Sequence, residues 1–412
     1  MKLKSAVLRG ADAAAGTLGL LDRKFDPDAL IAAAQRETGL RDFGDETFRE
    51  PLDRLLRACA AEASLSVVGR TAIHWDVRRF LVNLLYMRQV EIRSPGILDE
   101  EVRRPIFITG LPRSGTTFLH RLLMLDAANQ VPKVWETIFP YPVRGARDAD
   151  PAVRIQKVAR QLRAFESLAP EFPGLHPLKA TSPQECSEIS AHVFASLRFD
   201  TTQHIPSYRH WLDETGHVAA YRFHKRFLQH LQHRSDGERW VLKCPDHVFA
   251  LDDLREVYPD AQLVFVHRDP VKVLLSVTRL TEVVRRPFAR QLDRLEIGRQ
   301  ESERWLEGTR QMIRAAQTDP SIIHVHYSDV TADPLASVEA LYDRLDLTLP
   351  GAAADAIRQR TRAAPNGGYG VHRYTAEDYG LNLAEESEKF AEYTGYFGIE
   401  TESRRKRALV HA

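Results

Sequence analysis

The sequence predicts an α/β fold with a mainly parallel sheet flanked by helices, and an all-helical extension at the N-terminus. Two observations support this prediction. After residue 104, four short apolar runs that end at loops or prolines alternate with helical segments. Before residue 105, apolar residues recur at helical spacing and no strand-like run occurs. The 412 residues therefore divide into a helical extension (1–104) and an α/β domain (105–412).

Three helices are expected in the extension. Asp28–Thr38 is periodic and ends at Gly39, a residue suited to a helix C-cap. Thr47–Ala63 places its large apolar residues on one face, and Arg70–Val90 is longer and rich in apolar residues, including Trp75. We interpret these helices as a cap packed on the core. A part of an acceptor pocket and a dimer surface are the alternatives.

The first strand of the α/β domain leads into a glycine-containing loop. Ile106–Ile108 is a short apolar strand, and a helix is expected at Phe118–Leu125. From Gly110 the loop reads Gly-x-x-x-x-Gly-Thr-Thr, in which Thr116 stands where a nucleotide triphosphatase has lysine. This layout predicts a P-loop-type three-layer fold. A phosphate-like anion would bind to the loop amides and the helix N-terminus, with Arg113 adding positive charge. The binding residues are then Arg113, Ser114, Gly115, Thr116 and Thr117.

The remaining elements alternate in the same way. The sequence predicts loops at Pro132–Pro142 and 168–184, and strands at Trp240–Pro245, Gln262–His267 and Ser321–Tyr327. Helices are expected at Val153–Ser167, Glu185–Phe199, Ala219–His233, Phe249–Val257, Val271–Leu280 and Val284–Ala316.

A second anion site is expected where the strand 262–267 ends. Arg268 and Asp269 follow this strand, and Ser276 lies eight residues after Arg268 on the next helix. A guanidinium and a hydroxyl hold a phosphate by charge-assisted and neutral hydrogen bonds. Ligands of open α/β sheets also bind at the carboxyl ends of the strands. The alternative is a surface Arg–Asp pair in which Asp269 caps the helix.

Four landmarks in order resemble one known family. Pro112-Arg-Ser-Gly-Thr-Thr is similar to the 5′-phosphosulfate loop of sulfotransferases, and Val266-His-Arg-Asp-Pro with Ser276 looks like their 3′-phosphate motif. Leu242-Lys-Cys-Pro-Asp-His247 resembles the strand and loop between those motifs in the bacterial branch. Gly370–Leu381 resembles the nucleotide-covering segment, placed here at about residues 365–385. The resemblance spans roughly residues 105–400.

The resemblance implies 3′-phosphoadenosine 5′-phosphosulfate (PAPS) as donor, 3′,5′-bisphosphoadenosine (PAP) as product, and no required metal. Arg113, where animal cytosolic members carry lysine, would neutralise the leaving oxygen, and Lys243 would reach the same oxygen or the sulfonate; a surface lysine is the alternative. Glu136, 23 residues after Arg113, is the expected base, because branches with arginine in the loop place a glutamate near this distance. Trp135 beside it would exclude water and raise its pKa. His247 is the second candidate for the base, with a helix-orienting histidine as its alternative.

The other candidate residues concern the nucleotide lid and the acceptor. A lid over the 3′-phosphate and adenine is expected from His372, Arg373 and Tyr374, which follow flexible glycines. Glu185 and Glu188 share one helix face and would line the acceptor pocket, unless they form a solvated helix terminus. The acceptor is a small hydroxylated or, as the weaker choice, amine-bearing molecule, and its type stays open among lipid, steroid, phenol and sugar. A homodimer also stays open.

Composition limits the alternatives. A net charge of +1 gives no reason to expect nucleic acid as a partner. The three cysteines are widely spaced without a metal pattern, and no long uninterrupted apolar run occurs, so we expect a cytoplasmic protein without membrane insertion. Two functional alternatives remain: a P-loop kinase or NTPase with a degenerate loop, and a non-catalytic nucleotide-binding homologue.

Overall fold

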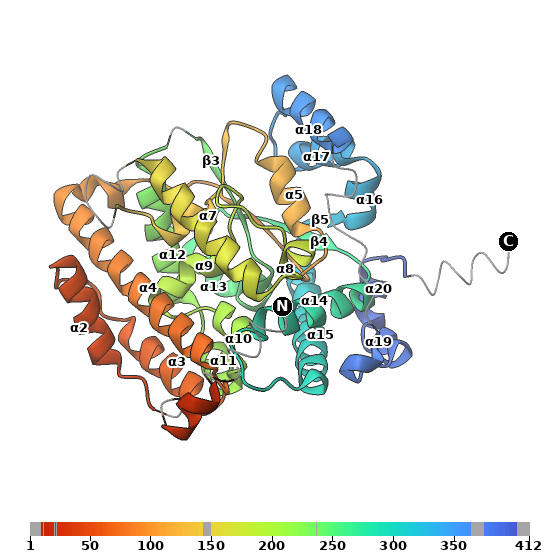
Figure 1. Ribbon diagram of the computed structural model, residues 1–412. Helices are drawn as coiled ribbons and strands as arrows, with labels where there is room; N and C mark the ends of the chain where they lie inside the picture. Colours follow the sequence, from red (N-terminus) through yellow and green to blue (C-terminus); the bar gives the residue numbers. More distant parts are fainter. Residues whose placement is uncertain are drawn as a thin grey trace. The chain divides into compact units, whose positions relative to one another are not determined.

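The computed structural model describes residues 10, 12–19, 21, 23–142, 150–235, 237–363 and 375–401 (Figure 1). The chain divides into two compact units, which we call the helical unit and the sheet unit. The helical unit contains Met1–Glu101, Pro132–Ser235 and Thr281–Leu292. The sheet unit contains Val102–Val131, Asp236–Leu280 and Asp293–Ala412. The division of the chain into domains at residue 104 stays a prediction.

A parallel sheet forms the centre of the sheet unit. Its strands lie in the order β2-β3-β1-β4-β5, and each neighbouring pair is parallel. The strands are β1 (Ile106–Gly110), β2 (Asn129–Gln130), β3 (Arg239–Lys243), β4 (Gln262–His267) and β5 (Ile323–His326). The sequence predicted four of them from apolar runs and missed the two-residue β2. The α/β fold class with a parallel sheet is confirmed.

Helices cover both faces of this sheet, because its side chains alternate between two buried surfaces. On one face, Ile106, Ile108 and Val264 pack with apolar residues of α5 (Thr116–Leu123), α17 (Pro334–Arg344) and α18 (Gly351–Ala363). Figure 1 shows α5, α17 and α18 side by side on the sheet unit. On the other face, Phe107 contacts His247 and Tyr258. The sheet unit thus has the three layers that the sequence predicts.

The other helices of the sheet unit follow the strands or the last crossover. They are η4 (Pro245–Phe249), α13 (Leu251–Val257), α14 (Pro270–Arg285), α15 (Arg294–Thr318), α16 (Tyr327–Ala332), η6 (Glu377–Tyr379), α19 (Leu383–Lys389) and α20 (Ala391–Tyr396). The end of α14, from Thr281 onward, is counted with the helical unit. One prediction here is wrong, since Val284–Ala316 is not one helix. α14 ends just before Pro287, which cannot donate a backbone hydrogen bond, and the Asp293 side chain caps the start of α15.

The helical unit is built around the long helix α4 (Val67–Arg93), whose middle is buried. Its helices are α2 (Pro27–Thr38), α3 (Arg49–Ala61), α4, η1 (Pro95–Asp99), α6 (Val134–Ile138), α7 (Pro151–Leu168), α8 (Phe172–Leu175), α9 (Cys186–Ser190), η3 (Ala191–Val193), α10 (Arg198–Thr202), α11 (Pro206–Thr215) and α12 (Val218–Gln232). The three predicted N-terminal helices are confirmed, and Gly39 ends α2 in the left-handed conformation at φ 71°.

Three predictions in the helical unit are wrong. The expected helix Glu185–Phe199 is interrupted, because α9 ends at Ser190 and Phe194 adopts the left-handed conformation at φ 56°. The expected loop Pro132–Pro142 contains the short helix α6, and the expected loop 168–184 contains α8. The prolines around α6 concealed it, since only five residues between them are helical.

Candidate functional site

The loop after β1 requires glycine at its first position. Gly110 has φ 137°, and a Cβ atom there would lie 2.4 Å from the carbonyl oxygen of Val266 on β4. That distance is shorter than any contact between real Cβ and oxygen atoms, so only glycine lets β1 turn here beside its neighbour. The sequence placed the turn correctly from the Gly-x-x-x-x-Gly pattern.

The start of α5 offers donors to an anion. Among the described residues, no side chain caps this helix, whose N-cap residue is Gly115 at φ 102°. Ser114 before it is fully buried, and within the described part of the chain its Oγ has no hydrogen-bond partner. Free amides at a helix start and an orphaned buried hydroxyl together fit a bound phosphate-like group. These residues therefore fit the nucleotide that the sequence motif implies.

Gly115 also lets an aromatic ring approach the loop. A Cβ atom on Gly115 would lie 2.4 Å from Cδ2 of Tyr327, the first residue of α16. We expect Gly115→Ala to weaken PAP binding at least tenfold, because the left-handed conformation costs a non-glycine residue about 1–2 kcal/mol and the ring must move. Calorimetry with PAP measures this, and Gly351→Ala, which has open space, is the control. Unchanged affinity in Gly115→Ala contradicts the expected role of the loop.

The two predicted anion motifs meet in the sheet unit. Arg113, in the left-handed conformation at φ 63°, donates from Nε to the Ser276 hydroxyl at 3.0 Å. Arg268 donates from Nη1 to the carbonyl oxygen of Arg113 at 2.6 Å, and its guanidinium lies 4.2 Å from the centre of the Tyr327 ring. Asp269 accepts a hydrogen bond from the Val271 N–H and so caps the start of α14. Arg113, Arg268 and Ser276 thus lie together.

Lys243 and His247 lie at the carboxyl end of β3. Lys243 lies opposite Ile108 in the parallel pairing of β3 with β1 and is only 2% exposed. The alternative that Lys243 is a surface lysine is therefore wrong. His247 is buried on η4, where its ring contacts the edge of Phe107 at a centroid distance of 5.1 Å. Burial brings both side chains into the core at the end of a strand adjoining β1. Their chemical roles stay predictions.

Glu136 belongs to the first turn of α6 in the helical unit. Its Oε2 accepts a hydrogen bond from the Lys133 N–H at 2.9 Å, and its Oε1 lies 3.8 Å from the Lys133 ammonium. Burial raises the pKa of Glu136 above its usual range, although the Lys133 charge opposes the shift. The neighbouring Trp135 ring lies 4.7 Å from the Arg154 guanidinium. A carboxyl group with a raised pKa suits proton transfer near neutral pH.

The chain resembles known proteins over most of its length. Residues 105–351 match the family model described as "Sulfotransferase family". The chain belongs to the sulfotransferase family. This sulfotransferase resembles the crystal structure of sulfotransferase STF1 from Mycobacterium tuberculosis H37Rv, with a TM-score of 0.77, 32% identity, and coverage of 90% of this chain and 100% of that one. Sulfotransferase STF9 from Mycobacterium avium gives a TM-score of 0.82 and 26% identity over 91% and 97% of the two chains.

A curated relative of this sulfotransferase has a more specific name. Omega-hydroxy-beta-dihydromenaquinone-9 sulfotransferase Stf3 from Mycobacterium bovis is 26% identical over 261 residues. The match covers 59% of this chain and 63% of the relative, so less than two thirds of the relative is matched. The kinase alternative is not favoured, because the family is shown and Thr116 replaces the phosphate-binding lysine.

Some predicted features of this sulfotransferase lie outside the described residues. These are His372, Arg373 and Tyr374 of the expected lid. Among the described residues, no three His, Cys, Asp or Glu side chains gather as a metal site would require. No described helix has the length and apolar character needed to cross a bilayer.

Sequence reasoning missed one residue of the site and left another undecided. Tyr327 was placed at the end of a strand, but its contacts with Gly115 and Arg268 were not foreseen. An aromatic residue directly after an apolar strand was the available signal. Glu188 was weighed between an acceptor pocket and a solvated helix terminus; it is 5% exposed and pairs with Arg79, so the solvated alternative is wrong.

Proposed function

We propose that this enzyme transfers a sulfuryl group from PAPS to a hydroxyl group of a small molecule, with Glu136 as the general base. The observation that carries the proposal is the cluster of Arg113, Ser276, Arg268 and Tyr327 beside a phosphate loop that lacks the Walker lysine. Two anion sites that share Arg113 suit a nucleotide with charge on both its 3′ and 5′ positions. ATP has no 3′-phosphate that Arg268 could bind.

The chain's own groups account for the chemistry. The loop amides, Arg113 and Lys243 hold the phosphosulfate and neutralise the oxygen that gains charge when the old S–O bond breaks. Glu136 takes the proton of the acceptor hydroxyl as its oxygen forms the new S–O bond, and PAP leaves. By analogy with phosphoryl transfer, most of the acceleration comes from positioning and electrostatics. His247 remains the second candidate for the base.

The choice of a hydroxyl acceptor has separate support. The name of the matched relative Stf3 describes a hydroxylated menaquinone as its substrate. A hydroxyl must lose its proton as the S–O bond forms, which gives a half-buried carboxylate with a raised pKa, such as Glu136, a function. An uncharged amine places a weaker demand on a base, so we favour the hydroxyl.

Arg268→Ala tests the donor. We expect PAP to bind about 10- to 150-fold more weakly to this variant, because hydrogen bonds to charged groups contribute about 1.5–3 kcal/mol. Binding of 5′-AMP, which has no 3′-phosphate, should change little. Calorimetry with PAP, 5′-AMP and ATP–Mg²⁺ measures the three affinities. Arg299→Ala, an exposed arginine of α15, is the matched control. The proposal is contradicted if ATP–Mg²⁺ binds most tightly, or if Arg268→Ala binds PAP as well as the unchanged enzyme does.

A further inference from the structure

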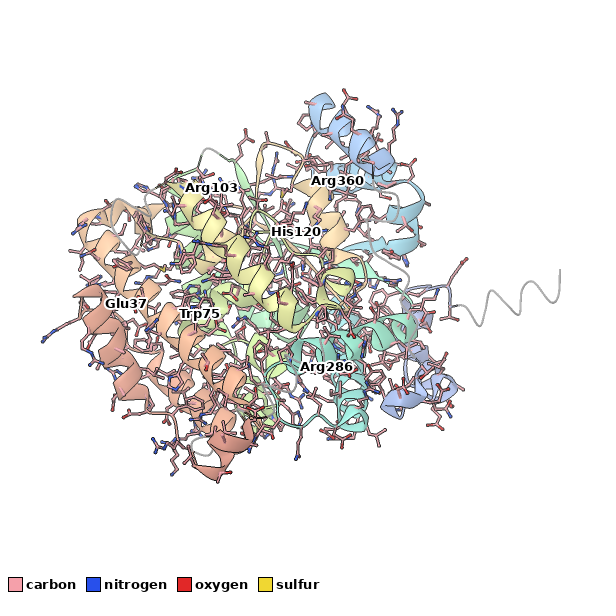
Figure 2. The ribbon with its side chains drawn as sticks, viewed as in Figure 1. Glu37, Trp75, Arg103, His120, Arg286 and Arg360 are labelled. Carbon is pink, nitrogen blue, oxygen red and sulfur yellow. The ribbon has the colours of Figure 1, made fainter. Side chains whose placement is uncertain are left out.

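The helix α20 and Phe397, which follows it, pack against the strand that leads to Arg268. The Tyr393 hydroxyl of α20 lies 3.0 Å from Nδ1 of His267, the last residue of β4. The Phe397 ring stacks on the His267 ring at a centroid distance of 4.1 Å. Figure 2 shows α20 beside α15 with the side chains drawn, and these two helices are in contact. Two side chains from this late part of the chain therefore hold the residue directly before Arg268.

The contact between Tyr393 and His267 is buried. Both side chains are 1% exposed. Burial raises the pKa of the Tyr393 hydroxyl, and the backbone N–H of Arg268 opposes that rise. The hydroxyl is therefore protonated at neutral pH and lies near both the His267 ring and the Arg268 backbone. Its partners matter, because a buried polar group that loses its hydrogen bond costs more than the bond itself contributes.

The hydrogen bonds form one chain across the end of the sheet. With the Arg268 N–H directed at the Tyr393 oxygen, the hydroxyl proton is donated to Nδ1 of His267. A neutral imidazole that accepts at Nδ1 carries its proton on Nε2. This Nε2 donates to Nδ1 of His324 on β5 at 2.9 Å. The chain thus runs from the hydroxyl of α20 through the end of β4 to β5.

Both histidines of this chain are neutral at neutral pH. Burial holds the pKa of His267 well below its usual range, and the neighbouring His324 and His326 act in the same direction. Burial also lowers the pKa of His324, together with Arg344 of α17 and His326. A protonated His324 would carry protons on both ring nitrogens, so Nε2 of His267 would lose its acceptor. The neutral rings therefore keep the chain of hydrogen bonds intact.

The same part of the chain also supports the helix that carries Ser276. Leu274, two residues before Ser276 on α14, is buried in a cluster with Tyr379, Leu381 and Phe390. Leu274 and Ser276 are less than one helical turn apart, so this packing fixes the turn from which the Ser276 hydroxyl projects. Residues near the end of the described chain thus contact neighbours of both side chains assigned to the 3′-phosphate.

We propose that Tyr393 is a positioning residue of the 3′-phosphate site, whose hydroxyl holds His267 and the Arg268 backbone so that the Arg268 guanidinium meets the phosphate. The other end of the Arg268 side chain is already held by the Arg113 carbonyl oxygen and the Tyr327 ring. With both ends fixed, the guanidinium needs little reorganisation when the phosphate binds, and such preorganisation increases affinity. The inference rests on the proposed donor, because PAPS supplies the 3′-phosphate.

The test is calorimetry of the full chain with PAP and with 5′-AMP in Tyr393→Phe. We expect PAP to bind about three- to tenfold more weakly, because the variant lacks the buried hydroxyl that fixes the Arg268 backbone. Binding of 5′-AMP, which has no 3′-phosphate, should stay the same and so shows that the variant is folded. In steady-state kinetics, the KM for PAPS should rise by the same factor as the PAP dissociation constant, with kcat unchanged.

Further variants distinguish positioning from a general loss of stability. His267→Phe keeps a ring beneath Phe397 but has no nitrogen atoms, so it should show the same selective loss of PAP affinity. Tyr342→Phe removes another buried tyrosine hydroxyl of the sheet unit and is the matched control, which should bind both nucleotides normally. In the Arg268→Ala background, Tyr393→Phe should not weaken PAP binding further, because the group that it positions is absent.

The outcomes separate this inference from the proposed function. If Arg268→Ala weakens PAP binding and Tyr393→Phe does not, the 3′-phosphate site stands and the inference is overturned. Equal losses for PAP and 5′-AMP in Tyr393→Phe also overturn it, as does a further loss in the Arg268→Ala background, since the hydroxyl then acts on the fold and not through Arg268. If Arg268→Ala binds PAP normally, the proposed function and this inference fail together.

Discussion

Replacing Glu136 by glutamine should lower kcat for sulfation by about 10²- to 10⁴-fold, the usual contribution of a general base. PAP binding should be retained, because Glu136 is assigned to proton transfer and belongs to neither of the two nucleotide motifs. Glutamine keeps the oxygen that accepts from the Lys133 N–H, so α6 should keep its first turn. Steady-state kinetics and calorimetry with PAP measure the two effects. Glu171→Gln, an exposed carboxylate of the same unit, is the matched control.

The pH dependence of kcat is a second test of Glu136 as the general base. A base acts when it is ionised, so kcat should rise as the pH passes upward through the raised pKa of Glu136. Lys133→Met removes the charge that opposes the shift, and this acid limb should move to higher pH. Glu136→Gln should abolish the limb. An unchanged acid limb in Glu136→Gln would assign the proton transfer to another group, with His247 as the next candidate.

Stability should change in the opposite direction to activity. The pKa of Glu136 is higher in the folded chain than in the unfolded one, so the folded state binds more protons between the two values. The free energy of unfolding then falls as the pH rises through that interval. At neutral pH, Glu136→Gln removes a half-buried charge and should leave Tm unchanged or raise it. A gain in stability with a loss of activity is typical of a residue kept for function.

The sheet could be predicted because its information is local. Each long strand is a short apolar run closed by glycine, proline or charge, as in Gln262–His267, and such runs leave little alternative to a buried parallel strand. Helices whose ends depend on capping side chains or on single prolines were either missed or predicted as one longer helix. The break between α14 and α15 depends on Pro287 and on the Asp293 cap, and α6 is shorter than two helical turns. Neither the break between α14 and α15 nor the short helix α6 produces a periodic pattern of apolar residues in the sequence.

In the site, too, features that depend on local sequence could be predicted and long-range contacts could not. The pairing of Arg113 with Ser276 was foreseeable, because both follow neighbouring strands at the carboxyl edge of one sheet. Tyr327 was not, since its approach to Gly115 depends on how α16 leaves β5. The buried network of Arg79 and Glu188 joins residues 109 positions apart, and no sequence pattern links them. This network therefore depends on how the chain packs and could not be predicted from the sequence.

Arg113→Ala should lower kcat by about 10²- to 10³-fold, the usual cost of removing one group that stabilises developing negative charge. The φ of 63° is equally unfavourable for arginine and alanine, so the loop backbone should keep its conformation. The Arg113 carbonyl that accepts from Arg268 also remains. The substitution therefore removes the guanidinium alone. Arg113→Lys keeps the positive charge at this position, so its kcat should lie between those of Arg113→Ala and the unchanged enzyme.

A double-mutant cycle separates two roles of Arg113. Its Nε donates to Ser276, so it acts either by neutralising the leaving oxygen or by holding that hydroxyl at the 3′-phosphate. If it only positions Ser276, Arg113→Ala should have no further effect on kcat in the Ser276→Ala background. If it acts on the leaving oxygen, the loss in kcat should persist there. The coupling should appear instead in PAP affinity, as an interaction energy of about 0.5–3 kcal/mol between the two substitutions. Additive PAP affinities would mean that the two anion sites act independently, although one arginine touches both.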